Sequence, residues 1–259
     1  GAFYLQETDL EIPNTVLPLA FTRFYRSGAA SFGPFGWNWD HSFNLFLREL
    51  NTGDIALWKN LHEEIFKFDG AGFGPQRGVF EKLERISALA QVYDIKGEGG
   101  TIMRFERPAG WIDGERIPLI WIKDRHGNQL RFTYGAEDKL AEVRDDDDRF
   151  FRFDYDQCGL LVAVSDHSGR KFQYQHDEET MQLVCVKSPA ISDHPNGITR
   201  IYHYEQPWAL PELRHNILRV EDAQGNVYLE NSYEQDPASW SYARVTEQLY
   251  GGFLYQFRY

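Results

Sequence analysis

The sequence predicts an all-β protein in which successive short β-hairpins form one continuous curved sheet. Aromatic residues make up 15% of the 259 residues, with 14 Tyr and 19 Phe against 2 Met, and such residues favour pleated, half-buried strands. A motif recurs every 21 residues through the middle of the chain, and apolar and polar residues alternate in the strand after each turn. A single hairpin cannot bury its aromatic face, so neighbouring hairpins must stack side by side.

The composition is typical of a folded chain and does not indicate nucleic acid or a membrane as a partner. Hydrophobic residues make up 42% and charged residues 25%, as in globular proteins. A net charge of −12 opposes approach to nucleic acid or an anionic bilayer. We find neither an apolar run long enough to span a membrane nor a secretory leader. We expect Cys158 and Cys185 to be free, partly buried thiols, since a chain of this size needs no disulfide.

The repeat begins with a leading strand and ends in a tyrosine. Its fixed positions are Leu119, Leu140 and Leu161, then Ile122, Val143 and Val164, then Asp124, Asp145 and Asp166. Tyr134 and Tyr155 follow 21 residues apart, and Tyr174 comes 19 residues later. Two further copies lie out of phase, at residues 183–186 and at residues 217–225 with Tyr233. The common period predicts one structural unit repeated along the chain.

Each unit has a turn that Asp opens and Gly closes. An Asp carboxylate can accept hydrogen bonds from backbone amides two residues on, and Gly supplies the positive φ that the turn requires. Residues 124–127, 166–169 and 222–225 follow this rule. In residues 145–148 Asp replaces Gly, and Asp tolerates the left-handed region at modest cost. A second turn, residues 156–159, links one repeat to the next.

The strand after each turn has one apolar face and one polar, solvent-facing face. Phe151, Phe153 and Tyr155 alternate with Arg152 and Asp154, as in a half-buried strand. We expect the aromatic face to line a curved partition. The leading strand is less regular, because its two apolar positions are three residues apart. It requires either a β-bulge or two buried faces, and the pattern does not choose between them.

We divide the chain into N-terminal strands at residues 1–50, an irregular β region of the same sheet at 51–115, and repeats at 116–259. Clusters of Pro and Gly predict inserted loops at residues 188–197 and 206–212, and a hairpin loop at residues 70–74. The alternating pattern returns at residues 253–259, so we expect the chain to be a piece of a longer protein. Its exposed sheet edges should make it associate or depend on the remainder.

The repeat residues resemble the YD repeat of the Rhs, teneurin and insecticidal toxin-complex families. That signature is roughly G-x-L-x-x-V-x-D-x-x-G-R-x-x-x-Y-x-Y-D, and the matching segment is Gly159-Leu-Leu-Val-Ala-Val-Ser-Asp166-His-Ser-Gly169-Arg170-Lys-Phe-Gln-Tyr174-Gln-His-Asp177. Residues 1–13, 17–19, 23–27 and 35–39 resemble the Rhs-associated segment that precedes the repeats in bacterial Rhs proteins. That family usually has Gly where Asn38 stands.

The resemblance implies a wall segment of a β-cocoon that encapsulates a C-terminal toxin, as in bacterial polymorphic toxins delivered by type VI secretion. The partners would be the toxin cargo polypeptide, the rest of the shell and components of a secretion system. The protein would be made in the bacterial cytoplasm and then exported or secreted. The chain shows no aspartyl self-cleavage segment and no toxin domain. Two other architectures or roles stay open: a carbohydrate-binding or adhesive cell-surface module, and a β-propeller, since two repeats approach the length of one blade.

Motifs for chemistry are weak, and we expect no catalytic residue, cofactor or metal site. The triplet His62-Glu63-Glu64 lacks the second His of a zinc protease, because residue 66 is Phe; a polar turn before a strand at residues 65–68 explains it better. The four acidic residues 145–148 could bind calcium, but the repeat explains them as a turn. No spacing singles out a carboxylate pair for glycoside hydrolysis. Exposed positions are expected for His126, His167 and His203. Core packing explains the seven tryptophans better than a sugar platform: Trp37, Trp39, Trp58, Trp111, Trp121, Trp208 and Trp240.

Overall fold

The N-terminal residues form a small antiparallel sheet of their own. The computed structural model describes residues 1–74, 80–87, 89–205 and 209–259. The small sheet has the order β1-β2-β5, with β1 (Tyr4–Ile12), β2 (Leu19–Arg26) and β5 (Trp39–His41). Between β2 and β5, the short strands β3 (Phe32–Gly33) and β4 (Gly36–Trp37) pair with each other.

Within the described ranges, 19 strands form a second, much larger antiparallel sheet. Strands β10 to β24 pair in chain order, which confirms the predicted succession of hairpins and excludes the separate blades of a propeller. Strands β6 to β9 form a branch that joins through β13, where residues 116–118 pair with residues 46–48. The strands are β6 (Phe46–Glu49), β7 (Ile55–Lys59), β8 (His62–Phe68), β9 (Phe73–Gly74), β10 (Lys82–Ser87), β11 (Val92–Lys96), β12 (Ile102–Phe105), β13 (Arg116–Lys123), β14 (Gln129–Tyr134), β15 (Leu140–Asp145), β16 (Phe150–Tyr155), β17 (Leu161–Asp166), β18 (Lys171–His176), β19 (Leu183–Lys187), β20 (Thr199–Tyr204), β21 (Ile217–Asp222), β22 (Val227–Tyr233), β23 (Val245–Tyr250) and β24 (Phe253–Gln256), with 3-10 turns η1 (Glu98–Gly100) and η2 (Ala136–Asp138).

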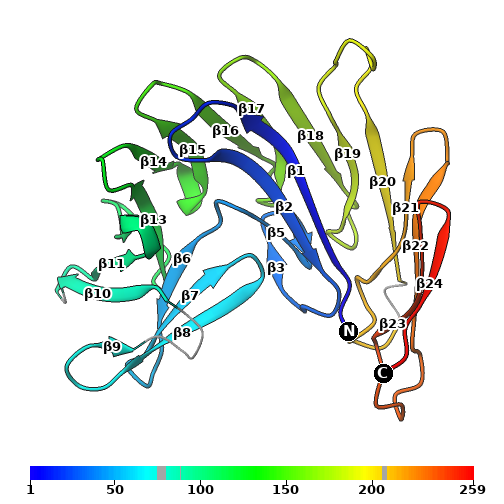
Figure 1. Ribbon diagram of the computed structural model, residues 1–259, viewed down its shortest axis with the longest axis horizontal. Helices are drawn as coiled ribbons and strands as arrows, with labels where there is room; N and C mark the ends of the chain where they lie inside the picture. The colour runs from blue at the N-terminus through cyan, green and yellow to red at the C-terminus, as the bar shows by residue number, and fades with distance from the viewer. Residues whose placement is uncertain (75–79, 88, 206–208) are drawn as a thin grey trace.

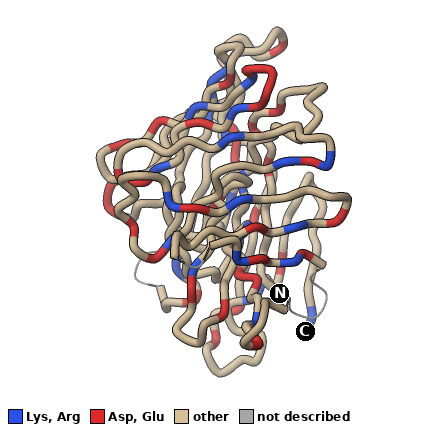
Figure 2. Tube along the Cα trace, turned by 90° about the vertical axis from the view of Figure 1, so that its left-hand side faces the viewer, with Lys and Arg blue, Asp and Glu red and all other residues tan. Residues whose placement is uncertain are grey.

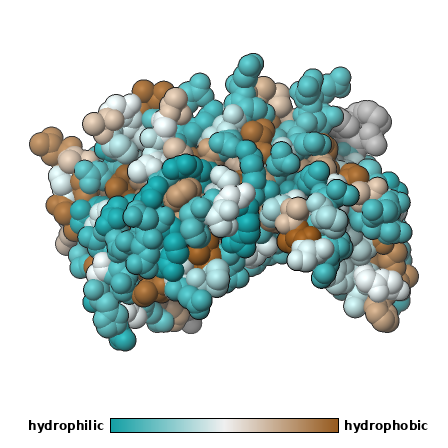
Figure 3. Space-filling view, turned by 90° about the horizontal axis from the view of Figure 1, so that it is seen from above, coloured by the Kyte–Doolittle hydropathy of each residue, from teal (hydrophilic) through white to brown (hydrophobic). Residues whose placement is uncertain are grey.

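The large sheet arches, and the N-terminal strands β1 and β2 cross in front of its central strands (Figure 1). Seen from above, the molecule is hollowed on one side between two flanks, and hydrophilic side chains predominate on the visible surface (Figure 3). Lys, Arg, Asp and Glu are interspersed along the strands and at the hairpin turns (Figure 2). In the described part of the chain, no helix is long and apolar enough to cross a bilayer.

A β-bulge recurs in every leading strand and explains its irregular spacing. Between β14 and β15 the partners are Thr133↔Glu142 and Tyr134↔Leu140, so Ala141 is an extra residue. The same shift occurs in the pairs β12–β13, β16–β17, β18–β19, β20–β21 and β22–β23. A bulge lets residues three apart face the same side and increases the local twist, so Leu140 and Val143 are both buried. Of the two alternatives that the sequence left open, the bulge is correct.

The turns have the predicted geometry. The Oδ1 atom of Asp166 accepts hydrogen bonds from the backbone amides of Ser168 (2.9 Å) and Arg170 (3.0 Å). Asp124, Asp145 and Asp222 accept the equivalent pairs of amide bonds. Asp148 has a φ of 62°, where Gly127, Gly169 and Gly225 also have positive φ. The substitution of Asp for Gly therefore preserves the turn.

The bulges also show that Tyr174 occupies a different position in its repeat from the one that the sequence spacing predicts. The residues opposite the first leading-strand position are Tyr134, Tyr155, His176, Tyr204 and Tyr233. We call these the end positions. Tyr174 therefore does not correspond to Tyr155 but to Phe153, two residues before the end position. We call this second series the inner positions: Phe132, Phe153, Tyr174, Tyr202 and Asn231. The repeat pattern in the sequence places Tyr174 at an end position, which is wrong. The reason is that a histidine, His176, occupies the end position of that repeat.

Several smaller expectations are resolved. His62 and Glu63 lie in β8 and not in a turn, which instead contains Asn60 and Leu61, both at positive φ. Residues 188–198 form a loop between β19 and β20, and residues 69–72 join β8 to β9. Of the second predicted loop, residues 206–208 lie outside the described residues. Both cysteines are free as expected, but Cys158 is exposed and only Cys185 is half-buried.

Candidate functional site

The aromatic face of the central repeats is covered by the N-terminal sheet. Phe21 packs against Phe153 and Tyr174, with ring centroids 5.7 and 6.5 Å apart. Trp39 packs edge-on against Tyr202 at 5.2 Å. These rings are buried in one core that includes both sheets. In the central repeats, the aromatic face that the sequence predicts to be dry is therefore buried in this seam between the two sheets.

A cluster of charged side chains lies inside the seam. Arg23 is completely buried and donates hydrogen bonds to Asp9 at 2.5 and 2.9 Å and to Glu7 at 2.8 Å. The hydroxyl of Tyr174 donates to Asp9, and that of Tyr202 donates to Glu7, each at 2.8 Å. Arg200 forms an ion pair with Glu7 from the repeat side. Two cations therefore balance two carboxylates in this seam.

The electrostatics of the cluster favour its ionised state. Burial alone would raise the pKa of Glu7, but Arg23 and Arg200 hold that pKa below its usual value. Burial alone would lower the pKa of Arg23, and the negative charge of Asp9 outweighs it, so the pKa is well above the usual value. Buried charges are tolerated when they are paired and hydrogen-bonded. The guanidinium also lies over the ring of Trp39 at 5.1 Å, a favourable cation–π geometry.

Another β-bulge places the acidic residues in the seam. The register of β1 on β2 shifts between Thr8↔Thr22 and Leu10↔Phe21, so Asp9 is the extra residue. Because a bulge redirects side chains, Asp9 turns toward the core together with Leu10, although neighbours in a regular strand face opposite sides. On β2 the inward side chains are Leu19, Phe21, Arg23 and Tyr25, all buried.

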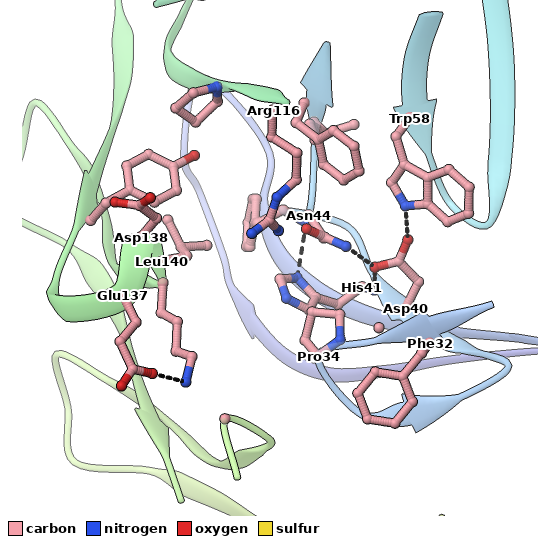
Figure 4. Close-up of a pocket in the computed structure, with 18 of the residues that line it drawn as sticks. Phe32, Pro34, Asp40, His41, Asn44, Trp58, Arg116, Glu137, Asp138 and Leu140 are labelled. Carbon is pink, nitrogen blue, oxygen red and sulfur yellow. Dashed lines mark hydrogen bonds and ion pairs between the residues drawn. The ribbon is translucent and has the colours of Figure 1, made fainter. Parts of the chain in front are cut away.

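A cavity of about 470 Å³ lies where the N-terminal strands, the segment 51–115 and the first repeats meet. Asp40, His41 and Asn44 line one side, and Arg116, Asp138 and the Glu137–Lys139 ion pair line the others (Figure 4). Asp40 accepts four N–H donors: the backbone amides of His41 and Leu61, the amide of Asn44 and the indole of Trp58. This carboxylate joins β5 to the β7–β8 hairpin.

Burial dominates the protonation of the two residues on the cavity wall. It raises the pKa of Asp40 to about 6, against the opposing effect of the hydrogen bonds. It lowers the pKa of His41 to about 3, so the imidazole is neutral. The His41 ring stacks on Phe153 and accepts the amide of Phe43 at 3.2 Å. The proton-accepting atoms of Asp40 thus already have protein partners, and the pair holds the strands together.

The acidic run at residues 145–148 is a repeat turn. Oδ1 of Asp145 accepts two backbone amides, and Oδ2 accepts Nε of Arg149 at 2.7 Å. Asp147 also pairs with Arg149. Among the described residues, no group of three or more His, Cys, Asp or Glu side chains is arranged to hold a metal ion.

The tryptophans do not form a common platform in the described part of the chain. Trp37 stacks on His215 with centroids 4.6 Å apart, and Trp58 stacks on Phe46. Trp39 is buried, and Trp111 lies edge-on against Tyr134. Trp121 lies under Lys123 and Arg104, and Trp240 is 66% exposed beside Arg244. Trp208 lies outside the described residues. Asn38, at a position where the Rhs-associated segment that this region resembles usually has Gly, has a φ of 64°.

Sequence reasoning missed the charge cluster in the seam. A signal was present, because Arg23 occupies an inward position between Phe21 and Tyr25 on β2. The expected exposure is correct for His126 and His167, whereas His203 is half-buried and pairs with Glu221 at 2.9 Å.

Comparisons with known proteins give one family match in the N-terminal part of the chain and similarities to solved structures at low sequence identity. The family described as a domain of unknown function (DUF6531) matches residues 1–65, and no curated protein matches the chain. The Photorhabdus luminescens Tc holotoxin pore (mutation TccC3-D651A) is similar over 73% of this chain and 12% of that chain, with 11% identity and a TM-score of 0.32. A porin-like protein from Bacteroides uniformis is similar over 99% of this chain and 93% of that chain, with 12% identity and a TM-score of 0.32. The chain thus spans about an eighth of the first of these structures and is similar to the DUF6531 family over its first 65 residues.

Proposed function

We propose that the chain is a non-catalytic wall segment of a shell of the Rhs/YD-repeat kind that encapsulates a toxin polypeptide. The observation that carries this proposal is the recurrence of one bulged hairpin in successive repeats, which produces a continuous arched sheet. Repetition of one structural unit suits a surface that separates two compartments, because each unit extends the same sheet. The YD-repeat pattern in residues 159–177 supports the choice of shell.

The last hairpin has the same features as the hairpins of the preceding repeats. The hydroxyl of Tyr259 donates to the carbonyl of Val245 at 2.9 Å, as Tyr233 donates to Ile217 at 3.0 Å. β24 therefore belongs to a complete repeat unit. In the repeats before it, a bulged leading strand pairs with the aromatic strand, whereas β24 pairs with β23 alone among the described strands. Phe253 is 70% exposed and Leu254 is 61% exposed. An open apolar edge of this kind promotes association.

The isolated chain should associate through this edge, which light scattering after size exclusion would detect. Phe253→Lys together with Leu254→Lys should make it monomeric, because charge on an edge strand opposes pairing. Gln173→Lys together with Gln175→Lys, at exposed positions of the interior strand β18, is the matched control and should leave association unchanged. Equal behaviour of the two variants would contradict the edge assignment.

The shell itself is tested in the longest natural polypeptide that contains these 259 residues. Segments that follow the repeats should resist a protease until the wall is opened by denaturant. Rapid cleavage of those segments in the native protein, or a polypeptide with no further segment to enclose, would refute the shell. A melting temperature that rises with a glycan would instead support the adhesive alternative, since a ligand of the native state stabilises it.

A further inference from the structure

The apolar part of the seam does not by itself fix where the N-terminal sheet lies along the repeats. Phe43 packs against both Phe132 and Phe153, which are inner positions of successive repeats. Phe21 likewise contacts Phe153 and Tyr174. Inner positions in neighbouring repeats thus present rings of nearly the same shape. Packing of similar rings distinguishes poorly between adjacent repeats, as in any periodic interface.

Hydroxyl groups break this repetition. Among the inner positions, a tyrosine occurs only in the described strands β18 and β20, at Tyr174 and Tyr202. Their hydroxyls donate to Asp9 and Glu7. A phenylalanine at the same place would leave a buried carboxylate oxygen without that donor, which is costly. Arg200, which also binds Glu7, lies two residues before Tyr202, and the residue two before Tyr174 is Phe172.

We propose that Tyr174, Tyr202 and Arg200 form a recognition code, read by Glu7 and Asp9, that fixes the position of the N-terminal sheet along the repeat sheet. Arg23 holds the two carboxylates in place from the N-terminal side. Buried polar groups elsewhere set the register of otherwise repetitive helical interfaces. The inference concerns the assembly of this chain and stands whether or not a cargo is enclosed.

The register can be read by cross-linking in the full chain after Cys158→Ser and Cys185→Ser. Nη2 of Arg170 donates to the carbonyl of Glu11 at 2.9 Å, so Glu11 lies beside the turn at residues 166–169. Glu11→Cys with Ser168→Cys reports the native register to a short bismaleimide. Glu11→Cys with Asp147→Cys reports a slip of one repeat, because Asp147 lies 21 residues before Ser168.

Tyr174→Phe with Tyr202→Phe should lower the native cross-link about tenfold, since two charge-assisted hydrogen bonds are lost. Amide exchange should accelerate in β1 and β2 while β18 and β20 stay protected. Tyr134→Phe with Tyr155→Phe removes two hydroxyls from the same sheet outside the cluster, and should change neither readout. Phe153→Tyr with Tyr202→Phe displaces the pair of hydroxyls by one repeat, and should raise the slipped cross-link above that of Tyr202→Phe alone.

Two results would overturn the proposal. If Tyr174→Phe with Tyr202→Phe keeps the native cross-link and the protection of β1 and β2, apolar packing sets the register. If the control variant loses the native cross-link to the same extent, the hydroxyls act on stability in general and carry no positional information.

Discussion

Replacing Arg23 by Met should be among the most destabilising single changes in this chain. The side chain of Arg23 is 0% exposed, and those of its partners Asp9 and Glu7 are 2% and 9% exposed. Met fills similar space, but it leaves Arg200 as the one remaining cation beside the two carboxylates in the described part of the seam. Breaking a buried ion pair by removing one partner costs about 3–5 kcal/mol, a large part of the typical ~5–15 kcal/mol that stabilises a domain. Urea denaturation, followed by the fluorescence of Trp39 and its neighbours, would measure the loss.

The control removes the uncompensated charge. Arg23→Met combined with Glu7→Gln and Asp9→Asn should recover much of the lost free energy of unfolding, because replacing a whole buried ionic group is often close to neutral. A loss below about 1 kcal/mol in Arg23→Met, in the range of surface pairs, would refute the assignment of this cluster as buried. The same conclusion would follow if the triple variant were no more stable than the single one.

Three further predictions concern the turns and the cavity wall. Asp166→Ala should lower the free energy of unfolding by about 1–3 kcal/mol, because two backbone amides lose the buried carboxylate that accepts their hydrogen bonds; unchanged urea midpoints would contradict this. Asp148→Gly should raise the free energy of unfolding by up to about 1 kcal/mol, because glycine adopts a positive φ without strain. Asp147→Gly is the control and should lower the free energy of unfolding. A change in the same direction in both variants would refute the turn argument. The pKa of Asp40 is raised to about 6, so its folded form binds a proton more tightly than the unfolded chain, and this group adds stability as pH falls from about 6 to about 4. Asp40→Asn should abolish that gain, and identical pH profiles would contradict it.

The repeat was predictable from the sequence because its determinants are local. The Asp and Gly of each turn are a few residues apart, and their hydrogen bonds depend on backbone geometry within one hairpin. The same locality explains why Asp148 could be assigned to the glycine position. The bulge was visible only as an ambiguity, since Leu140 and Val143 are three residues apart and two arrangements satisfy that spacing. Pairing with the neighbouring strand decides between them.

The seam was not predictable, because it joins residues that are far apart in the chain. Tyr202 and Glu7 are separated by 195 residues, and no local pattern connects them. The position of Arg23 among inward apolar residues indicated a buried charge, but it did not indicate which carboxylates form ion pairs with it. The segment that covers the aromatic face was not predictable for the same reason. The sequence of one strand indicates an apolar face that must be buried, but not what buries it. In this chain the N-terminal sheet buries it.

His176 offers a further test of the end positions. Tyr134, Tyr204 and Tyr233 donate their hydroxyls to the first carbonyl of the same repeat, whereas neither ring nitrogen of His176 makes the equivalent bond. Burial lowers the pKa of His176 to about 4. Below pH 6.5 the unfolded chain therefore binds the proton first, and folded stability falls as pH drops toward 4. His176→Tyr should restore a donor and flatten this part of the pH profile relative to the wild type.

His41 serves as the internal control for that experiment. Its pKa is also lowered, to about 3, so it contributes to the same acid-side loss in both proteins and cancels in the comparison. The difference between the two urea-midpoint profiles then isolates position 176. If His176→Tyr leaves the profile between pH 6.5 and 4 unchanged, His176 is not buried as a neutral ring. If it lowers the free energy of unfolding at pH 7, the cost of overpacking, typically about 1–3 kcal/mol, outweighs the restored hydrogen bond, and position 176 is shaped for histidine.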